Sequence, residues 1–256
     1  MRLALLTDDC MDAYMEIVQQ DYTDYYFFIY DILLHRDRTK VWLAVESFEI
    51  VGLMLIYNGC VVQLRGSPEA VGFLLSSLSL EHVEVVVPAD CEDMLLSKFP
   101  VYKTKENMTT MRLEKGKENL KTSTVPEKLQ LQSADAVAQL MRESYPIMWN
   151  EMTAEKVKVS ISAKETFLLG IRVDGQLAAF GSAMLTSNVG LVCWLGTSIQ
   201  YRQRGYCTSI LSALVQEGFK LADFMAIHVL EDNLTARRIY EAVGFKPYRS
   251  YVLLKT

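Results

Sequence analysis

The sequence predicts a mixed α/β fold, built from helices and strands with both hairpin and crossover connections. Short apolar runs typical of strands alternate with amphipathic runs typical of helices along the whole chain. The same order of such runs occurs on both sides of a polar middle segment. Half of the 256 residues are apolar and 22% are charged, so the chain has enough apolar side chains for a sizeable core.

The middle of the chain reads as a linker between two domains. The segment "LEKGKENLKTSTVPEKLQL", residues 113–131, is rich in Lys and Thr, contains Gly116 and Pro126, and interrupts the apolar periodicity. We therefore predict one domain over residues 1–120 and a second over residues 121–256.

The two halves resemble each other in the order of their elements. "KVWLAVESFEIVGLMLIY" in the first half and "TFLLGIRVDGQLAAFGSAML" in the second each predict two strands joined by a turn. Each pair is followed by a third strand, a glycine-containing loop, a helix, a strand, a shorter helix and a closing strand. This order predicts a tandem repeat of one α/β unit. The alternative is chance, because strand–turn–strand patterns are common.

In the second half, turn and capping residues indicate where the predicted helices and strands begin and end. Asp174-Gly175 is a two-residue hairpin signal, and Ser133 is a candidate helix cap. The segment "SYPIMWNEMT" is expected to be a loop or a second short helix. The predicted helices are 133–143, 205–221 and 233–243, and the predicted strands are 166–173, 176–186, 189–198, 224–230 and 248–255.

Composition excludes several classes of function. The net charge of −5, with no run of five or more like charges, disfavours a nucleic-acid partner. Asp8 and Asp9 come too early for a signal peptide, and no apolar run reaches transmembrane length. We therefore expect a cytoplasmic protein with no membrane partner. Neither a disulfide framework nor a metal site is expected, because the cysteines are odd in number and form no CxxC pair: Cys10, Cys60, Cys91, Cys193 and Cys207.

The loop "RQRGYC" has the features of an anion site. Gly205 permits a tight turn, and the backbone amides that follow it open a helix without intrahelical partners. Such amides form a cradle for a phosphate, to which Arg202 and Arg204 add full positive charges. A pyrophosphate is therefore the expected ligand. The alternative is a glycine turn flanked by solvated arginines.

A second segment, "VLEDNLTARRIYEAVGF", places polar side chains on an apolar helix face. Asn233, Ala236 and Tyr240 fall at helical spacing and share that face. This arrangement indicates that they line a cleft. The alternative is a helix cap at Asn233 and a core tyrosine whose hydroxyl is satisfied by the backbone.

Together the two segments resemble the GNAT superfamily of acyl-CoA N-acyltransferases. The resemblance covers residues 190–247 and rests on R-x-x-G-x-[GA] after a strand, then N-x-x-A-x-x-x-Y and Gly-Phe, and it is closest to the glycine N-acyltransferase-like branch. One departure is Cys207, which stands where the family usually has Gly or Ala. The first half resembles the same fold but has "LRGSPEAV" at the place of the cradle. The first half therefore resembles a degenerate copy of the GNAT fold that no longer binds the cofactor.

The resemblance implies acetyl-CoA as the cosubstrate, with no metal. Its pyrophosphate would lie on the amides of residues 203–208, and its pantetheine arm along the edge of strand 189–198, where this strand splays from strand 224–230. A backbone N–H near Thr197 would polarise the thioester carbonyl, and Tyr240 would protonate the departing sulfur. The implied cofactor-binding residues are Thr197, Ser198, Ile199, Arg202, Gln203, Arg204, Gly205, Tyr206, Cys207, Thr208, Asn233, Ala236 and Tyr240.

The general base is less well defined, because strand 189–198 carries no glutamate. His228 on the next strand is one candidate, and its alternative is an ordinary core histidine. Glu231 and Asp232 are other candidates. Cys193 as an acyl-enzyme nucleophile is a weaker one, since no cation stands near it in the sequence to lower its pKa. Transfer from an already neutral amine needs no base at all.

The expected activity is therefore N-acetyl transfer from acetyl-CoA to a primary amine of a small molecule or a peptide, in a ternary complex. A non-catalytic acyl-CoA-binding or regulatory protein is the alternative, and the missing glutamate favours it. A homodimer is compatible with either. The aromatic segment "DYTDYYFFIYDILLH", residues 21–35, would line an acceptor pocket or build core.

Overall fold

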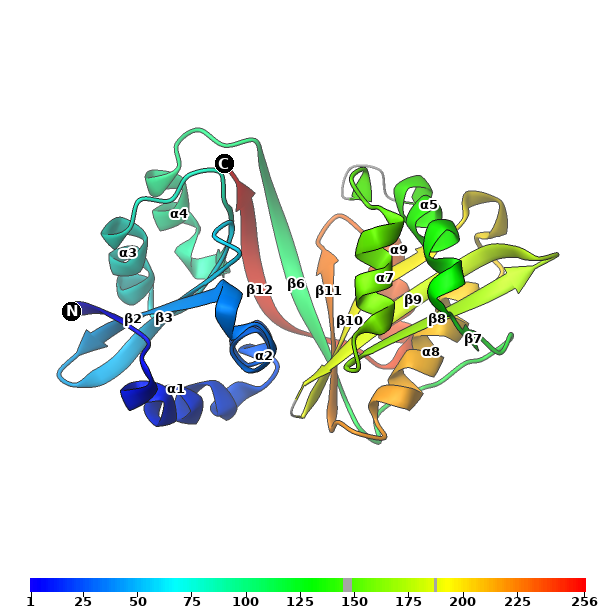
Figure 1. Ribbon diagram of the computed structural model, residues 1–256, viewed down its shortest axis with the longest axis horizontal. Helices are drawn as coiled ribbons and strands as arrows, with labels where there is room; N and C mark the ends of the chain where they lie inside the picture. The colour runs from blue at the N-terminus through cyan, green and yellow to red at the C-terminus, as the bar shows by residue number, and fades with distance from the viewer. Residues whose placement is uncertain (145–148, 187) are drawn as a thin grey trace. The chain divides into compact units, whose positions relative to one another are not determined.

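The structure, a computed structural model, describes residues 1–144, 149–186 and 188–256. Part of the predicted loop or helix over residues 144–153 therefore lies outside the described residues. The chain divides into two compact units, each treated by itself below (Figure 1). Unit 1 comprises Met1–Thr110, Val229–Asp232 and Tyr248–Thr256, and unit 2 comprises Met111–His228 and Asn233–Pro247. The domain boundary near residue 120 stays a prediction.

The helices and strands follow the same order twice along the chain. In the N-terminal repeat they are β1 (Arg2–Leu5), α1 (Met11–Val18), α2 (Tyr26–Leu34), β2 (Thr39–Glu46), β3 (Glu49–Tyr57), β4 (Val61–Gly66), α3 (Pro68–Ser77), β5 (Glu84–Pro88), α4 (Glu92–Lys98) and β6 (Thr104–Glu114). In the C-terminal repeat they are β7 (Glu127–Lys128), α5 (Ala134–Ser144), α7 (Ala154–Ser162), β8 (Thr166–Val173), β9 (Gln176–Thr186), β10 (Val189–Thr197), α8 (Tyr206–Gly218), β11 (Phe224–Leu230), α9 (Leu234–Val243) and β12 (Lys246–Lys255). The predicted mixed α/β class is thus confirmed.

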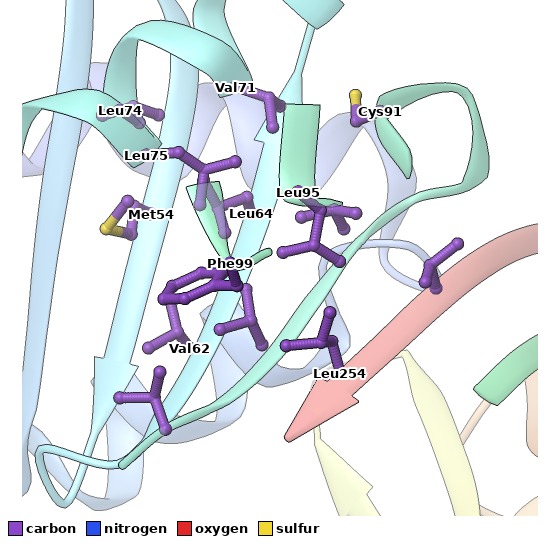
Figure 2. Close-up of a cluster of buried hydrophobic side chains, with 14 of the residues drawn as sticks. Met54, Val62, Leu64, Val71, Leu74, Leu75, Cys91, Leu95, Phe99 and Leu254 are labelled. Atoms are coloured by element: carbon purple, nitrogen blue, oxygen red, sulfur yellow. The ribbon is translucent and has the colours of Figure 1, made fainter. Parts of the chain in front are cut away.

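The sheet of unit 1 is completed by a strand from the C-terminal part of the chain. Its strand order is β1-β2-β3-β4-β5-β12, with β4 and β5 parallel and β12 antiparallel to β5. Leu254 of β12 packs in the same buried cluster as Leu95 and Phe99, as Figure 2 shows. The fold of unit 1 therefore uses apolar side chains that lie far apart in the sequence.

The sheet of unit 2 has the order β11-β10-β9-β8-β7, with helices on both faces (Figure 1). Phe180 of β9 is buried in a cluster with α5 and α7. Its neighbour Gly181 faces α8, because an added Cβ would lie 2.6 Å from Ile210. Asp174 and Gly175 link β8 to β9 with φ of 50° and 79°, the left-handed pair that a two-residue hairpin requires.

The aromatic segment of the N-terminal repeat builds core. Of its side chains, Tyr26, Phe28 and Ile29 on α2 are all nearly fully buried. Asp31 on the same helix is only 6% exposed, and its burial raises the pKa of the carboxyl from 3.8 to about 7. This segment is therefore explained by packing, with one carboxyl group held in a poorly hydrated place.

Replacing Asp31 with Asn should stabilise the protein at pH 8 and change little at pH 4. The folded chain keeps the Asp31 proton up to about pH 7, whereas the unfolded chain loses it near pH 4. The free energy of unfolding therefore falls as pH rises through this window, by about 1.4 kcal/mol for each unit of pKa difference. Urea unfolding at the two pH values measures the effect. Asp12→Asn, an exposed carboxyl on α1, should keep the pH dependence of the wild type.

Candidate active site

The parallel pairing of β10 with β11 stops halfway along β10. Pairs run only from Val189↔Phe224 to Val192↔Ile227, while β10 stays paired with β9 as far as Thr197↔Ala179. The register with β9 shifts between Val192 and Trp194, which marks a bulge. Among the described residues, the β11-facing edge of residues 193–197 thus has no strand partner. An open edge of this kind can pair with an extended, amide-bearing ligand.

The N-terminus of α8 lies just beyond this edge and begins at Gly205. This residue has φ of 80° and ψ of 0°, and no side chain caps the helix. Helical bonding starts with Ser209 N–H donating to Gly205 O at 3.0 Å. The amides of residues 206–208 therefore have no acceptor within the described chain, and with the helix dipole they form a site for an anion.

The two arginines of the loop have different surroundings. Arg202 Nε donates to Thr197 O at 3.3 Å, and its Nη2 donates to Ser144 O at 3.4 Å. Arg204 lies over the ring of Tyr201 at 5.4 Å and has neither a hydrogen bond nor an ion pair with the described residues. Arg202 therefore holds the loop against the ends of β10 and α5, whereas the guanidinium of Arg204 stays available for a bound anion.

The remaining predicted loop residues fall at the same end of β10. Ser198 N donates to Ala178 O at 2.9 Å, which extends the pairing with β9 by one residue. Ile199 is 69% exposed and opens a short 3-10 turn. Gln203 is exposed with φ of 62°, so two of the three residues before α8 are left-handed. The left-handed conformations of Gln203 and Gly205 thus turn the chain from the end of β10 into the start of α8.

Helix α9 brings Tyr240 next to the first turn of α8. Tyr240 is 7% exposed, and its ring lies 6.4 Å from that of Phe245. Burial, together with the neighbouring Cys207, raises the pKa of its hydroxyl, so Tyr240 remains a neutral proton donor. Asn233 acts as the cap of α9, since its Oδ1 accepts from Ala236 N at 3.1 Å. Asn233 and Ala236 therefore fit the capping alternative, whereas the environment of Tyr240 suits an acid.

His228 lies on the other face of the sheet from α8. Met225 faces α8, because an added Cβ at Gly218 would lie 2.2 Å from its sulfur. Side chains alternate along β11, so His228, three residues later, faces the side of α5 and α7. It is half-buried, and Glu231 and Asp232 are exposed. Of these three candidate bases, only His228 is on a strand of unit 2.

The two cysteines of the site have the properties of neutral thiols. Burial raises the pKa of Cys193 to about 12, and its Sγ donates to Leu191 O at 3.3 Å. Burial also raises the pKa of Cys207 to about 12. A thiol of this kind is a poor nucleophile, because the thiolate is the reactive form. Their environment therefore does not support an acyl-enzyme on either cysteine.

The linker contributes contacts that sequence reasoning missed. Lys121 N donates to Ser212 Oγ at 3.0 Å, and Ser123 N donates to Ser209 Oγ at 3.1 Å. The Ser123 hydroxyl would also lie 3.2 Å from a Cβ added to Gly205. The linker thus packs along α8 as far as its first turn. The available signal was a pair of serines, three residues apart, on the buried face of that helix.

The equivalent place in the N-terminal repeat is closed by its own side chains. Helix α3 begins with Pro68, which has no N–H to offer, and the Ser67 hydroxyl accepts from Ala70 N at 3.3 Å. Parallel pairing of β4 with β5 also stops early, at Gln63↔Val86. Just beyond that point Arg65 is buried, and its guanidinium donates to Asp24.

The C-terminal arrangement fits an acyl-CoA ligand. Three amides without an acceptor, a free guanidinium and an open strand edge match a diphosphate followed by an extended amide-bearing arm. Among the described residues, no group of three or more His, Cys, Asp or Glu side chains is placed to hold a metal ion. No helix in the described part of the chain is long and apolar enough to cross a membrane.

Comparison with known proteins finds similarity to acetyltransferases in both sequence and structure. Residues 134–245 match the model of the acetyltransferase (GNAT) family. No curated protein sequence matches the chain significantly. A GNAT-family acetyltransferase from Colwellia psychrerythraea is similar over 100% of this chain and 99% of its own, with 14% identity and a TM-score of 0.63.

Two further solved structures cover nearly the full length. A Drosophila protein has a TM-score of 0.72 at 11% identity, over 99% of this chain and 98% of its own. A tandem GNAT protein from the clavulanic acid biosynthesis pathway has a TM-score of 0.64 at 12% identity, over 100% and 98% of the two chains. At such identities the likeness shows the fold. Fold and site are those expected of an acyl-CoA-dependent acyltransferase. By sequence, the match to the acetyltransferase (GNAT) family covers residues 134–245, less than half of the chain.

Proposed function

We propose that this protein is an N-acetyltransferase that moves an acetyl group from acetyl-CoA to a primary amine of a small molecule or a peptide. The observation that carries the proposal is the combination of unpaired amides at the start of α8 with the open edge of β10. All residues of this site belong to unit 2. The resemblance of residues 190–247 to the glycine N-acyltransferase-like branch supports a small molecule as the amine acceptor.

The reaction would be a direct transfer within a ternary complex. The amine nitrogen attacks the thioester carbon, the amide C–N bond forms, and the C–S bond breaks. The backbone N–H near Thr197 polarises the carbonyl, and Tyr240 gives its proton to the leaving sulfur. His228, on the face away from α8, accepts the proton that the amine loses, directly or through water. The products are the amide and free CoA.

A non-catalytic acyl-CoA-binding protein is the second candidate. It is favoured by one observation, the absence of any Asp or Glu from residues 189–197 of β10. The buried and protonated Tyr240 beside the cradle supports the enzyme instead. The N-terminal repeat, whose own cradle is closed, would shape the acceptor side or form an interface.

Replacing both Arg204 and Gly205 with Glu should weaken acetyl-CoA binding at least about 100-fold. The change removes the guanidinium of Arg204 and places two carboxylates beside the diphosphate. It also places a side chain on Gly205, which has a left-handed backbone conformation. Calorimetric titration of acetyl-CoA into the wild type and the variant measures the effect.

The matched control is Arg38→Glu with Gly59→Glu in unit 1. It makes the same change in charge, and it likewise places a side chain on a glycine of positive φ, since Gly59 has φ of 73°. We expect it to bind acetyl-CoA as the wild type does. A folded wild type that binds no acetyl-CoA would contradict the proposed function.

A further inference from the structure

The hydroxyl of Thr197 is buried without a partner. Among the described residues its Oγ1 is the one buried side-chain nitrogen or oxygen atom that makes no hydrogen bond. The carbonyl of the same residue accepts from Arg202 Nε at 3.3 Å, and its strand runs beside Ala179 of β9. The hydroxyl takes part in neither of these contacts.

Folding does not account for a hydroxyl at this position. A buried hydroxyl that loses water and gains no partner is unfavourable, and valine has nearly the same shape without it. Thr197 is also the residue at which β10 ends, within the edge that β11 leaves unpaired. A polar group that the protein leaves unsatisfied beside an open edge suits a partner that arrives with a ligand.

The direction of the side chain identifies which part of a ligand it can meet. Gly196 faces α5, because an added Cβ would lie 2.9 Å from Ser144 Oγ. Successive side chains alternate, so Thr197 faces the opposite side, which is the side of α8 and Tyr240. The hydroxyl is uncharged and can both donate and accept, which matches an amide better than a phosphate.

We propose that the Thr197 hydroxyl hydrogen-bonds an amide of the pantetheine arm of acyl-CoA and so positions the thioester beside Tyr240. This inference rests on the proposed function. It makes Thr197 a positioning residue through its side chain, in addition to its backbone. The diphosphate stays with the amides of α8 and with Arg204.

The test uses two variants and two ligands in calorimetric titrations of the full chain. Thr197→Val removes the hydroxyl and keeps the shape, and Thr197→Ser keeps the hydroxyl. Acetyl-CoA contains the arm, whereas 3′-phospho-ADP has the diphosphate without it. Thr197→Val should bind acetyl-CoA about tenfold more weakly than the wild type and 3′-phospho-ADP equally well. Thr197→Ser should retain most of the affinity for acetyl-CoA.

Thermal unfolding gives an independent readout. Because the hydroxyl has no partner in the protein, Thr197→Val should unfold at the temperature of the wild type or above it. A clear drop in this temperature would show that the hydroxyl is bonded within the protein, which overturns the inference.

The remaining outcomes separate this inference from the proposed function. If the wild type binds acetyl-CoA and Thr197→Val binds it equally well, the inference fails and the proposed function stands. If Thr197→Val loses affinity for both ligands alike, the hydroxyl serves the diphosphate, and the assignment to the arm is wrong. If the wild type binds neither ligand, the proposed function fails and the inference fails with it.

Discussion

Replacing Tyr240 with Phe is expected to lower turnover about 100-fold or more, while acetyl-CoA still binds. The variant keeps the ring that packs near Phe245 and loses only the hydroxyl. Because burial raises the pKa of this hydroxyl above its ordinary value, the wild type keeps the proton through the whole neutral range and beyond. The rate should therefore rise with pH as the amine becomes neutral, with no alkaline fall from Tyr240 below about pH 10. Release of CoA from acetyl-CoA in the presence of candidate amines measures the rate.

Tyr102→Phe is the matched control, since Tyr102 is 42% exposed and belongs to unit 1. It should leave turnover unchanged. Equal turnover of Tyr240→Phe and the wild type would rule out Tyr240 as the acid. Binding of acetyl-CoA by the wild type with no turnover for any amine would instead favour the non-catalytic protein.

Replacing Asp24 with Ala should lower the free energy of unfolding by about 3–5 kcal/mol. Asp24 Oδ1 accepts from Arg65 Nε at 2.5 Å, and the Tyr251 hydroxyl donates to the same carboxyl. Arg65 is only 5% exposed and lies 4.3 Å from the centre of the Tyr251 ring. Removing the carboxyl leaves the guanidinium of Arg65 buried without its counter-charge. An unpaired buried charge lowers the free energy of unfolding more than removal of both partners does. Urea unfolding followed by circular dichroism measures the loss.

The double variant Asp24→Ala with Arg65→Met should recover much of that stability, because it removes the stranded charge together with its partner. Glu155→Ala breaks an exposed ion pair with Lys158 on α7 and should leave the free energy of unfolding nearly unchanged. A loss below about 1 kcal/mol for Asp24→Ala would mean that water or another group replaces the carboxyl.

Local signals in the sequence predicted much of the C-terminal repeat. The pair Asp174-Gly175 gave the hairpin because few residues adopt its left-handed conformation. Gly205 gave the start of α8 for the same reason. The mixed α/β class followed from the period of the apolar residues. These features depend on residues close together in the chain, where propensity and periodicity apply.

Features that depend on distant residues were not predictable in this way. Nothing local shows that Arg202 binds two backbone carbonyls while Arg204 stays free, since both are arginines of one loop. The contacts of the linker with Ser209 and Ser212 join residues about ninety positions apart. The unpaired hydroxyl of Thr197 also appears only once its neighbours are in place. Each is decided by tertiary packing rather than by local preference.

The origin of β12 bears on how the chain folds as it is synthesised. Residues 248–256 belong to unit 1, although they are translated after all of unit 2. Leu254 fills the core of unit 1, and Thr256 N bonds Val83 O at 3.0 Å. On the ribosome, the sheet that begins first therefore finishes last, and β5 keeps an unpaired edge while more than a hundred further residues emerge. An unpaired strand edge of this kind is a place where a nascent chain can pair with another chain and aggregate.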